Sequence, residues 1–158
     1  MTSAFERHDH SACASVALAR AEEMAAAHGL RLTPVRRRVL EILLEDHRAM
    51  GAYEVLERLA AEGLGKQPPV AYRALDFLVE NGLAHRIQRL NAFTACASAD
   101  LPGHAPAFLI CRECQTVAEL DAGGLCAGLA DAAAPAGFAV ERATIEALGL
   151  CAGCAKRA

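Results

Sequence analysis

Two pairs of cysteines restrict this sequence more than any other feature. Cys111 and Cys114 form one Cys-x-x-Cys pair, and Cys151 and Cys154 form a second pair near the C-terminal end. Such a pair places two thiolates at neighbouring corners of a tetrahedron. Two pairs complete the four-cysteine shell of a structural Zn²⁺, with Zn–S bonds of about 2.3 Å. We therefore predict that one zinc ion ties these two parts of the chain together.

Other interpretations of these cysteines fit less well. A thioredoxin-like redox pair lies between a strand and a helix, and the second pair, four residues before the C-terminus, lacks that context. Disulfides require an oxidising compartment, and the first residues do not resemble a signal peptide. Because no run approaches ~20 apolar residues, we expect a cytoplasmic protein whose seven cysteines stay reduced.

The first part of the sequence is predicted to be a winged helix-turn-helix domain, residues 13–96, within an α+β fold. Apolar residues recur at helical spacing in four segments, and two short alternating runs follow them. Thr33 and Pro34 are the expected N-cap and first residue of the second helix. We expect helices at residues 13–28, 34–46, 52–63 and 68–82, and hairpin strands at residues 83–88 and 93–96.

The second part, residues 104–158, is predicted to be a smaller α/β domain. Residues 97–103, which include Pro102-Gly103, are the expected hinge, and residues 1–12 are expected to form a flexible arm. In the second domain we expect strands at residues 107–111, 116–120 and 138–147 and a helix at residues 125–134.

The fourth expected helix separates its side chains onto two faces. Apolar residues share one face: Ala71, Ala74, Leu75, Leu78 and Val79. The other face carries Pro69, Tyr72, Arg73 and Asp76. Residues 31–89 hold ten basic and eight acidic residues, whereas the segments before and after them are net acidic. The basic excess is small, and it permits binding of a polyanion such as DNA without establishing it.

Side chains of this region have chemistry that suits DNA contacts. Arg73 is suited to a bidentate pair with guanine, and Tyr72 is suited to packing on a thymine methyl group. Expected phosphate contacts, which position the protein without reading sequence, are Arg36, Arg37, Arg38 and Tyr53.

Four further potential ligands lie near the expected domain boundary: His85, Cys96, His104 and Glu119. Each alone is more often an ordinary residue than a ligand. Together they offer two imidazoles, one thiolate and one carboxylate, a set that suits Zn²⁺ better than Mg²⁺, Ca²⁺ or Mn²⁺. Because the ligands come from separate elements, a bound ion would fix the angle between the domains, as a switch requires.

The N-terminal residues His8, His10 and Cys13 are candidates for a further metal site. We favour the plainer interpretation, which is a disordered arm and a helix-facing thiol. We assign no role to His28 or His47.

Three stretches carry a resemblance to a known family. The first is LTPVRRRVL at residues 32–40. The second is QPPVAYRALDF at residues 67–77, followed by GLAH at residues 82–85. The third is FLICREC at residues 108–114, which continues to Glu119 and is completed by GLCAGC at residues 149–154. In these motifs the chain resembles the Fur superfamily of bacterial metalloregulators and, within it, most resembles the zinc uptake regulators. The match spans nearly the whole chain after residue 30.

The resemblance implies a role for each set of residues. It implies that the cysteine pairs hold structural zinc, that the four boundary residues His85, Cys96, His104 and Glu119 hold a regulatory zinc, and that Tyr72 and Arg73 read bases. It also implies a homodimer formed through residues 104–158. The expected function is a repressor of zinc-uptake genes that binds palindromic operator DNA when zinc is present.

Two departures from the family pattern bear on these expectations. Val70-Ala71 stands where the family usually has Thr-Val, so a hydroxyl that would cap the recognition helix or contact phosphate is missing. The His-rich segment of the iron regulators is short here and contributes only His104, which favours the zinc branch.

Three other functions remain as alternatives. A regulator of the same fold that responds to iron or peroxide is disfavoured by Cys96 as a soft ligand. A thiol oxidoreductase or zinc hydrolase is disfavoured because four protein ligands leave no open metal position, and we expect no enzyme activity. A zinc-storage or delivery protein would not need the face that carries Tyr72 and Arg73.

Overall fold

The computed structural model describes residues 4–5, 10–97 and 105–157. Its helices are α1 (His10–Ala27), α2 (Pro34–Leu44), α3 (Ala52–Ala61), α4 (Pro68–Glu80), α5 (Gly123–Ala133) and α6 (Ala152–Ala155), with a 3₁₀ turn η1 (Ala134–Ala136). Its strands are β1 (Ala84–Ile87), β2 (Ala92–Ala95), β3 (Pro106–Cys111), β4 (Val117–Asp121) and β5 (Ile145–Gly149). Within the described ranges, none of the helices has the length and apolar character that crossing a bilayer requires.

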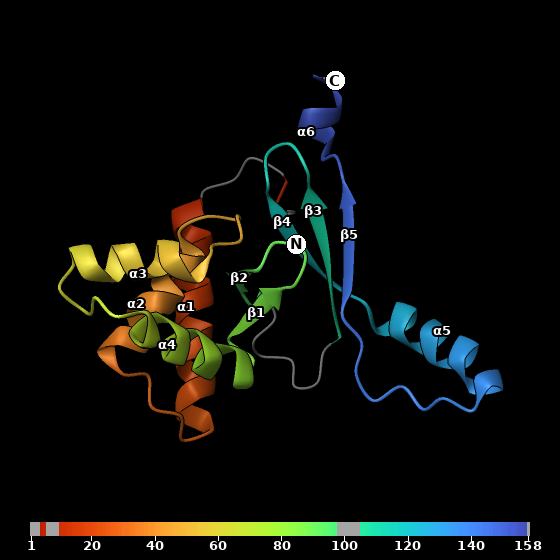
Figure 1. Ribbon diagram of the computed structural model, residues 1–158, viewed down its shortest axis with the longest axis horizontal. Helices are drawn as coiled ribbons and strands as arrows, with labels where there is room; N and C mark the ends of the chain where they lie inside the picture. The colour runs from red at the N-terminus through yellow and green to blue at the C-terminus, as the bar shows by residue number, and fades with distance from the viewer. Residues whose placement is uncertain (1–3, 6–9, 98–104, 158) are drawn as a thin grey trace.

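The N-terminal unit packs α1 to α4 around one apolar core (Figure 1). Thr33 caps α2 as predicted, because its hydroxyl oxygen accepts a hydrogen bond from the Arg36 nitrogen at 3.4 Å. Leu40, Val55 and Leu75 are fully buried between α2, α3 and α4. The four predicted helices are therefore confirmed, with small differences at their ends.

The β1–β2 hairpin forms the predicted wing and also joins the two units of the chain. Its strands pair antiparallel, and the turn passes through Asn91, whose φ is 46°. Ile87 from the hairpin is buried together with Phe108, Ile110 and Val117 from the sheet. This second, smaller core fixes the wing against the C-terminal unit.

The C-terminal unit is a three-stranded sheet with the order β4-β3-β5. Strand β3 pairs antiparallel with β4 and parallel with β5. Helix α5 connects β4 to β5 and extends away from the sheet in Figure 1. It has no buried residue, and its Leu125 and Leu129 are 59% and 46% exposed. Because a free helix of this length is marginal in water, α5 needs a surface to pack against.

Two boundaries predicted from the sequence are wrong. Residues 10–12, which were expected to lie in the arm, belong to α1, because this helix already begins at His10. The strand expected at residues 138–147 begins only at Ile145, where its pairing with Ala107 of β3 starts. Residues 138–144 have no pairing partner in β3, and Phe138 is 66% exposed.

Candidate metal centres and nucleic-acid interface

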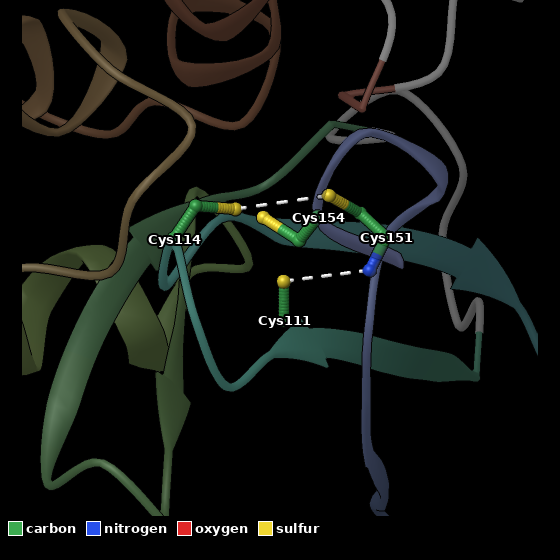
Figure 2. A group of neighbouring side chains, drawn as sticks. All are labelled: Cys111, Cys114, Cys151 and Cys154. Carbon is green, nitrogen blue, oxygen red and sulfur yellow. Dashed lines mark hydrogen bonds between the residues drawn. The ribbon is translucent and has the colours of Figure 1, made fainter. Parts of the chain in front are cut away.

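The four cysteines of the two pairs come together beside one end of the sheet (Figure 2). Cys111 ends β3, Cys114 follows in the turn to β4, and Cys151 and Cys154 lie at α6. All four sulfur atoms lie within 4.8 Å of one another, and those of Cys114 and Cys151 are 3.9 Å apart. Neighbouring sulfur atoms around a tetrahedral zinc are separated by about 3.8 Å, so this arrangement fits the ion.

The thiols of this cluster differ in their ionisation. Backbone N–H groups of Cys114 and Cys151 stabilise the Cys111 thiolate and lower the pKa of this thiol to about 6. Arg157 donates to the Cys154 sulfur at 3.2 Å, but the adjacent Cys151 sulfur and burial outweigh it and raise the pKa of Cys154 to about 11. Four thiolates without a cation would repel one another, and a divalent ion removes that conflict.

His85, Cys96 and Glu119 form a second cluster, between the two units. The Glu119 Oε1 atom lies 3.5 Å from His85 Nε2 and 3.8 Å from the Cys96 sulfur. Around a tetrahedral zinc the corresponding distances are about 3.3 Å and 3.5 Å, so a small convergence would place all three at bonding distance. The His85 and Glu119 side chains are only 16% and 6% exposed.

The elements around this cluster hold each side chain in place. The ring of His85, on β1, lies against the Phe108 ring of β3, with centroids 5.3 Å apart. Cys96 is buried and directly follows β2. The Oε2 atom of Glu119, on β4, accepts a hydrogen bond from the Ala97 backbone nitrogen at 2.8 Å. Glu119 thus already binds the segment that leaves the wing. The fourth predicted ligand, His104, lies outside the described residues.

A third cluster brings together His10, Cys13 and His47. Sequence reasoning placed His10 and Cys13 with His8, which lies outside the described residues, and gave His47 no role. His47 lies in the loop between α2 and α3, far from α1 in the sequence, so no spacing pattern connects it with the other two residues. The plainer interpretation of a disordered arm does not hold for His10, which is part of α1.

Two further polar contacts join the N-terminal and C-terminal units. The Glu146 carboxylate on β5 accepts hydrogen bonds from the backbone nitrogens of Gln88 and Arg89, at 2.6 Å and 2.9 Å. The His47 carbonyl oxygen accepts one from the Val117 nitrogen at 2.7 Å. Sequence patterns gave no indication of either contact, because both join backbone groups in loops to distant strands.

The face of α4 that carries Tyr72 and Arg73 is exposed, as the helical spacing predicts. Ala71, Ala74, Leu75 and Leu78 are buried, while Tyr72 is 41% exposed and Arg73 is exposed beside it. The Arg73 Nε atom donates to the Pro69 carbonyl oxygen at 3.2 Å. Tyr53, at the start of α3, is 62% exposed.

The arginines of α2 are engaged within the chain. The Arg36 guanidinium lies 3.6 Å from the centre of the Phe77 ring. Arg37 pairs with Glu22 at 2.6 Å and also with Glu41, and Arg38 pairs with Glu62 at 2.7 Å. The charges of Arg37 and Arg38 are therefore already compensated, so phosphate contacts from these two residues would require new partners for the carboxylates.

Val70, one of the two departures from the family pattern, has a structural role. It is the third residue of α4, and the N-cap position belongs to Gln67, so a hydroxyl at residue 70 would not be the cap. That part of the sequence interpretation is wrong. The Val70 side chain instead fills the space beside Gly65, where an added Cβ atom would lie 2.7 Å from Val70 Cγ1.

Comparison with known sequences identifies similar proteins. Residues 27–148 match the Ferric uptake regulator family. The zinc uptake regulation protein of Escherichia coli (strain K12) is 40% identical to this chain over 137 residues, which cover 87% of this chain and 80% of that protein.

Solved structures give matching similarities. A zinc uptake regulator complexed with zinc and DNA superposes with a TM-score of 0.85 at 38% identity, covering 91% of this chain and 96% of that chain. Holo XcZur gives 0.79 at 36% identity, with 94% and 99% covered. Apo XcZur gives only 0.51 at 37% identity, with 90% and 97% covered. This chain is therefore arranged more like the holo form than like the apo form.

Proposed function

Because this chain belongs to the ferric uptake regulator family, we propose that it is a zinc-responsive transcriptional repressor of zinc-uptake genes. It binds palindromic operator DNA as a homodimer when its regulatory site holds Zn²⁺. Relatives named for zinc uptake regulation, one of them solved with zinc and DNA, support this choice. The observation that carries it is the cluster of His85, Cys96 and Glu119, which draws its members from both units of the chain.

The regulatory zinc would be held by this cluster together with His104. His85 and Cys96 belong to the wing, whereas Glu119 belongs to the sheet. An ion shared by them adds a bond between units that are otherwise joined by a small apolar core and a few hydrogen bonds. Zinc therefore favours the relative orientation of the units in which all of its ligands meet, because it binds that orientation more tightly than the others.

We assign DNA binding to residues 13–96, the hinge to residues 97–103, and dimerisation and metal binding to residues 104–158. The position of Cys96, at the end of the wing, supports a boundary directly after it. The hydrogen bond from Ala97 to Glu119 supports the same boundary, because it ties the first hinge residue to the sheet. Zinc at Cys96 would then act where the chain passes from one unit to the other.

The structural zinc would be held by Cys111, Cys114, Cys151 and Cys154. These residues fix the end of β3 to α6, the C-terminal helix. With four thiolates the shell is closed and leaves no open position for a substrate. The ion's role there is to contribute folding free energy, because the unfolded chain has no preformed site.

Operator recognition is assigned to α4. In this proposal Arg73 donates to guanine O6 and N7 in the major groove, and Tyr72 packs beside it against a thymine methyl group. The exposure of Tyr72 and Arg73 on α4 supports this assignment. Tyr53 and Arg36 are proposed to contact phosphates, which set the register of α4 on the duplex. Arg37 is a weaker candidate, since its charge is paired with Glu22 and Glu41.

Dimerisation is assigned to the uncovered apolar surface of the C-terminal unit. Large apolar side chains of the C-terminal unit are between 46% and 66% exposed: Leu120, Leu125, Leu129, Phe138 and Leu148. A second copy would bury this surface and give α5 the packing that it lacks in one chain. The twofold axis of such a dimer would present two α4 helices to the half-sites of a palindrome.

The test is operator binding by the purified protein, measured by fluorescence anisotropy at buffered free Zn²⁺ and then at buffered free Fe²⁺ or Mn²⁺. We expect zinc alone to give tight binding that a chelator reverses, while one firmly held zinc per chain remains. Equal activation by iron or manganese would make the protein a regulator with another signal. Zinc binding without any specific DNA binding would instead favour a zinc-storage or delivery protein.

A further inference from the structure

We propose that His10, Cys13 and His47 form a third metal site, which takes an exchangeable Zn²⁺ and fastens the start of α1 to the loop between α2 and α3. It shares no ligand with the two centres described above. Its existence can therefore be tested whether or not the proposed function is right.

The positions of the three side chains suit a common ion. His10 and Cys13 are three residues apart on the first turn of α1, so they project from the same side of the helix. Their ligand atoms and that of His47 lie within 4.8 Å of one another. The two imidazole rings have centroids 4.3 Å apart and are tilted by 57°, so one nitrogen of each ring can point to a shared position.

The donor set selects the kind of ion. Two imidazoles and one thiolate are borderline to soft ligands, which suit Zn²⁺ and disfavour Mg²⁺ and Ca²⁺. Among the described residues the cluster has three ligands, which leave a fourth position, in contrast to the closed shell of the four cysteines. An ion held in this way exchanges more readily than the structural zinc.

The surroundings enclose the site while leaving it accessible. Both ring nitrogens of His10 are shielded from solvent, whereas Cys13 is exposed. A pocket of about 460 Å³ adjoins the cluster, and its lining includes Arg20, Asp46 and Cys96. Asp46 favours a cation there and Arg20 opposes one, so the neighbouring formal charges balance. Because the pocket is also lined by the exposed Cys13, it gives the ion a route to the cluster.

The place of the site in the fold indicates what its occupation would do. The carbonyl oxygen of His47 accepts a hydrogen bond from Val117 on β4, and the next residue, Arg48, bridges to Thr116. An ion on His47 therefore links α1 to a loop that already contacts the C-terminal unit. The same pocket reaches Cys96, so the third site lies beside the cluster assigned to zinc sensing.

The test uses the full-length reduced chain with its firmly held zinc in place and Co²⁺ as a spectroscopic probe for the remaining sites. We expect the wild type to bind two further equivalents of Co²⁺, and the double variant His10→Ala/His47→Ala to bind one. Cys13→Ser should remove one thiolate-to-cobalt charge-transfer contribution and leave that of Cys96. His28→Ala, which changes an exposed histidine at the far end of α1, is the matched control and should behave as wild type.

Two results would overturn the proposal, whether or not the cluster of His85, Cys96 and Glu119 binds metal. One is a double variant that binds as much Co²⁺ as the wild type. The other is a wild type that binds no Co²⁺ beyond its firmly held zinc. If the double variant does not fold, Cys13→Ser decides the question, because Cys13 is exposed and its replacement leaves the helix intact. An unchanged cobalt spectrum for Cys13→Ser then excludes the site.

Discussion

Glu146 on β5 accepts a hydrogen bond from the backbone nitrogen of Gln88, in the turn of the wing, at 2.6 Å. Its second carboxylate oxygen accepts one from Arg89 at 2.9 Å. Strand β5, at one edge of the sheet, thus contacts the turn of the wing. Strand β4, at the other edge, contacts the end of the wing through Glu119 and Cys96. The arrangement that resembles the holo form is supported at two separate points.

Replacing Glu146 with glutamine should weaken zinc-dependent operator binding. The change removes the negative charge of the carboxylate that accepts the two hydrogen bonds. At this exposed position we expect a loss of about 1 kcal/mol, which is about fivefold in operator affinity. The measurement is anisotropy at saturating zinc. Glu141→Gln removes the same charge from the exposed segment before β5 and should leave affinity unchanged. Equal effects of the two variants would mean that the contact does not support the DNA-binding arrangement.

Replacing Gly65 with alanine should destabilise the turn between α3 and α4. Gly65 has a φ of +148°, and an added Cβ atom would meet Val70 Cγ1 at 2.7 Å. We expect a loss of about 1–3 kcal/mol in unfolding free energy together with weaker DNA binding. Gly63→Ala is the control, because its φ is +74° and nothing lies within 4 Å. Chemical denaturation should show a larger loss for Gly65→Ala, and a smaller loss would contradict this interpretation of Val70.

Replacing Arg73 with lysine should relax operator specificity while keeping the charge. Lysine cannot form the bidentate pair with guanine, so discrimination at one base pair should fall by about 1–3 kcal/mol. The salt dependence of binding should stay the same, because the number of phosphate contacts does not change. Arg112→Lys, in the exposed turn between β3 and β4, is the control. A specificity profile unchanged by Arg73→Lys would remove this residue from the base-reading face.

Acid should release the structural zinc at a higher pH when Arg157 is replaced with alanine. Arg157 donates to the Cys154 sulfur and lowers the pKa of a thiol that its other neighbours raise to about 11. Without Arg157 that pKa rises further, so protons compete with zinc already at a higher pH. The pKa of Cys111, lowered to about 6, keeps that thiolate available down to mildly acidic pH in both proteins.

The readout for Arg157→Ala is zinc transfer to a chromophoric chelator across a pH series. Lys156→Ala removes the same charge from the neighbouring exposed residue and should release zinc as the wild type does. Coincident release curves for Arg157→Ala and Lys156→Ala would show that Arg157 does not act through Cys154.

Features encoded within one segment could be predicted from the sequence. The two faces of α4 follow from helical spacing, and the cap at Thr33 follows from local hydrogen bonding. The four-cysteine cluster was predictable because each Cys-x-x-Cys pair is itself a local signal. The three described members of the second cluster were named from their ligand chemistry, and the family resemblance assigned them to regulation.

Features that depend on tertiary neighbours could not be predicted. The start of β5 is set by where β3 offers pairing positions, which residues 138–144 do not reveal. His47 reaches the cluster with His10 and Cys13 only because α1 packs against α2. Glu146 is one carboxylate among many in the sequence, and only the fold places it against the wing.

The decisive measurement is the operator affinity of Cys96→Ser as a function of free zinc, alongside the wild type. Zinc should tighten binding by the wild type about 5- to 150-fold, the usual range of allosteric coupling. The variant should lose that dependence while it remains a folded dimer with its four-cysteine zinc bound, because Cys96 is not part of that cluster. A Cys96→Ser protein that keeps the zinc dependence of the wild type would contradict the assignment of zinc sensing to His85, Cys96 and Glu119.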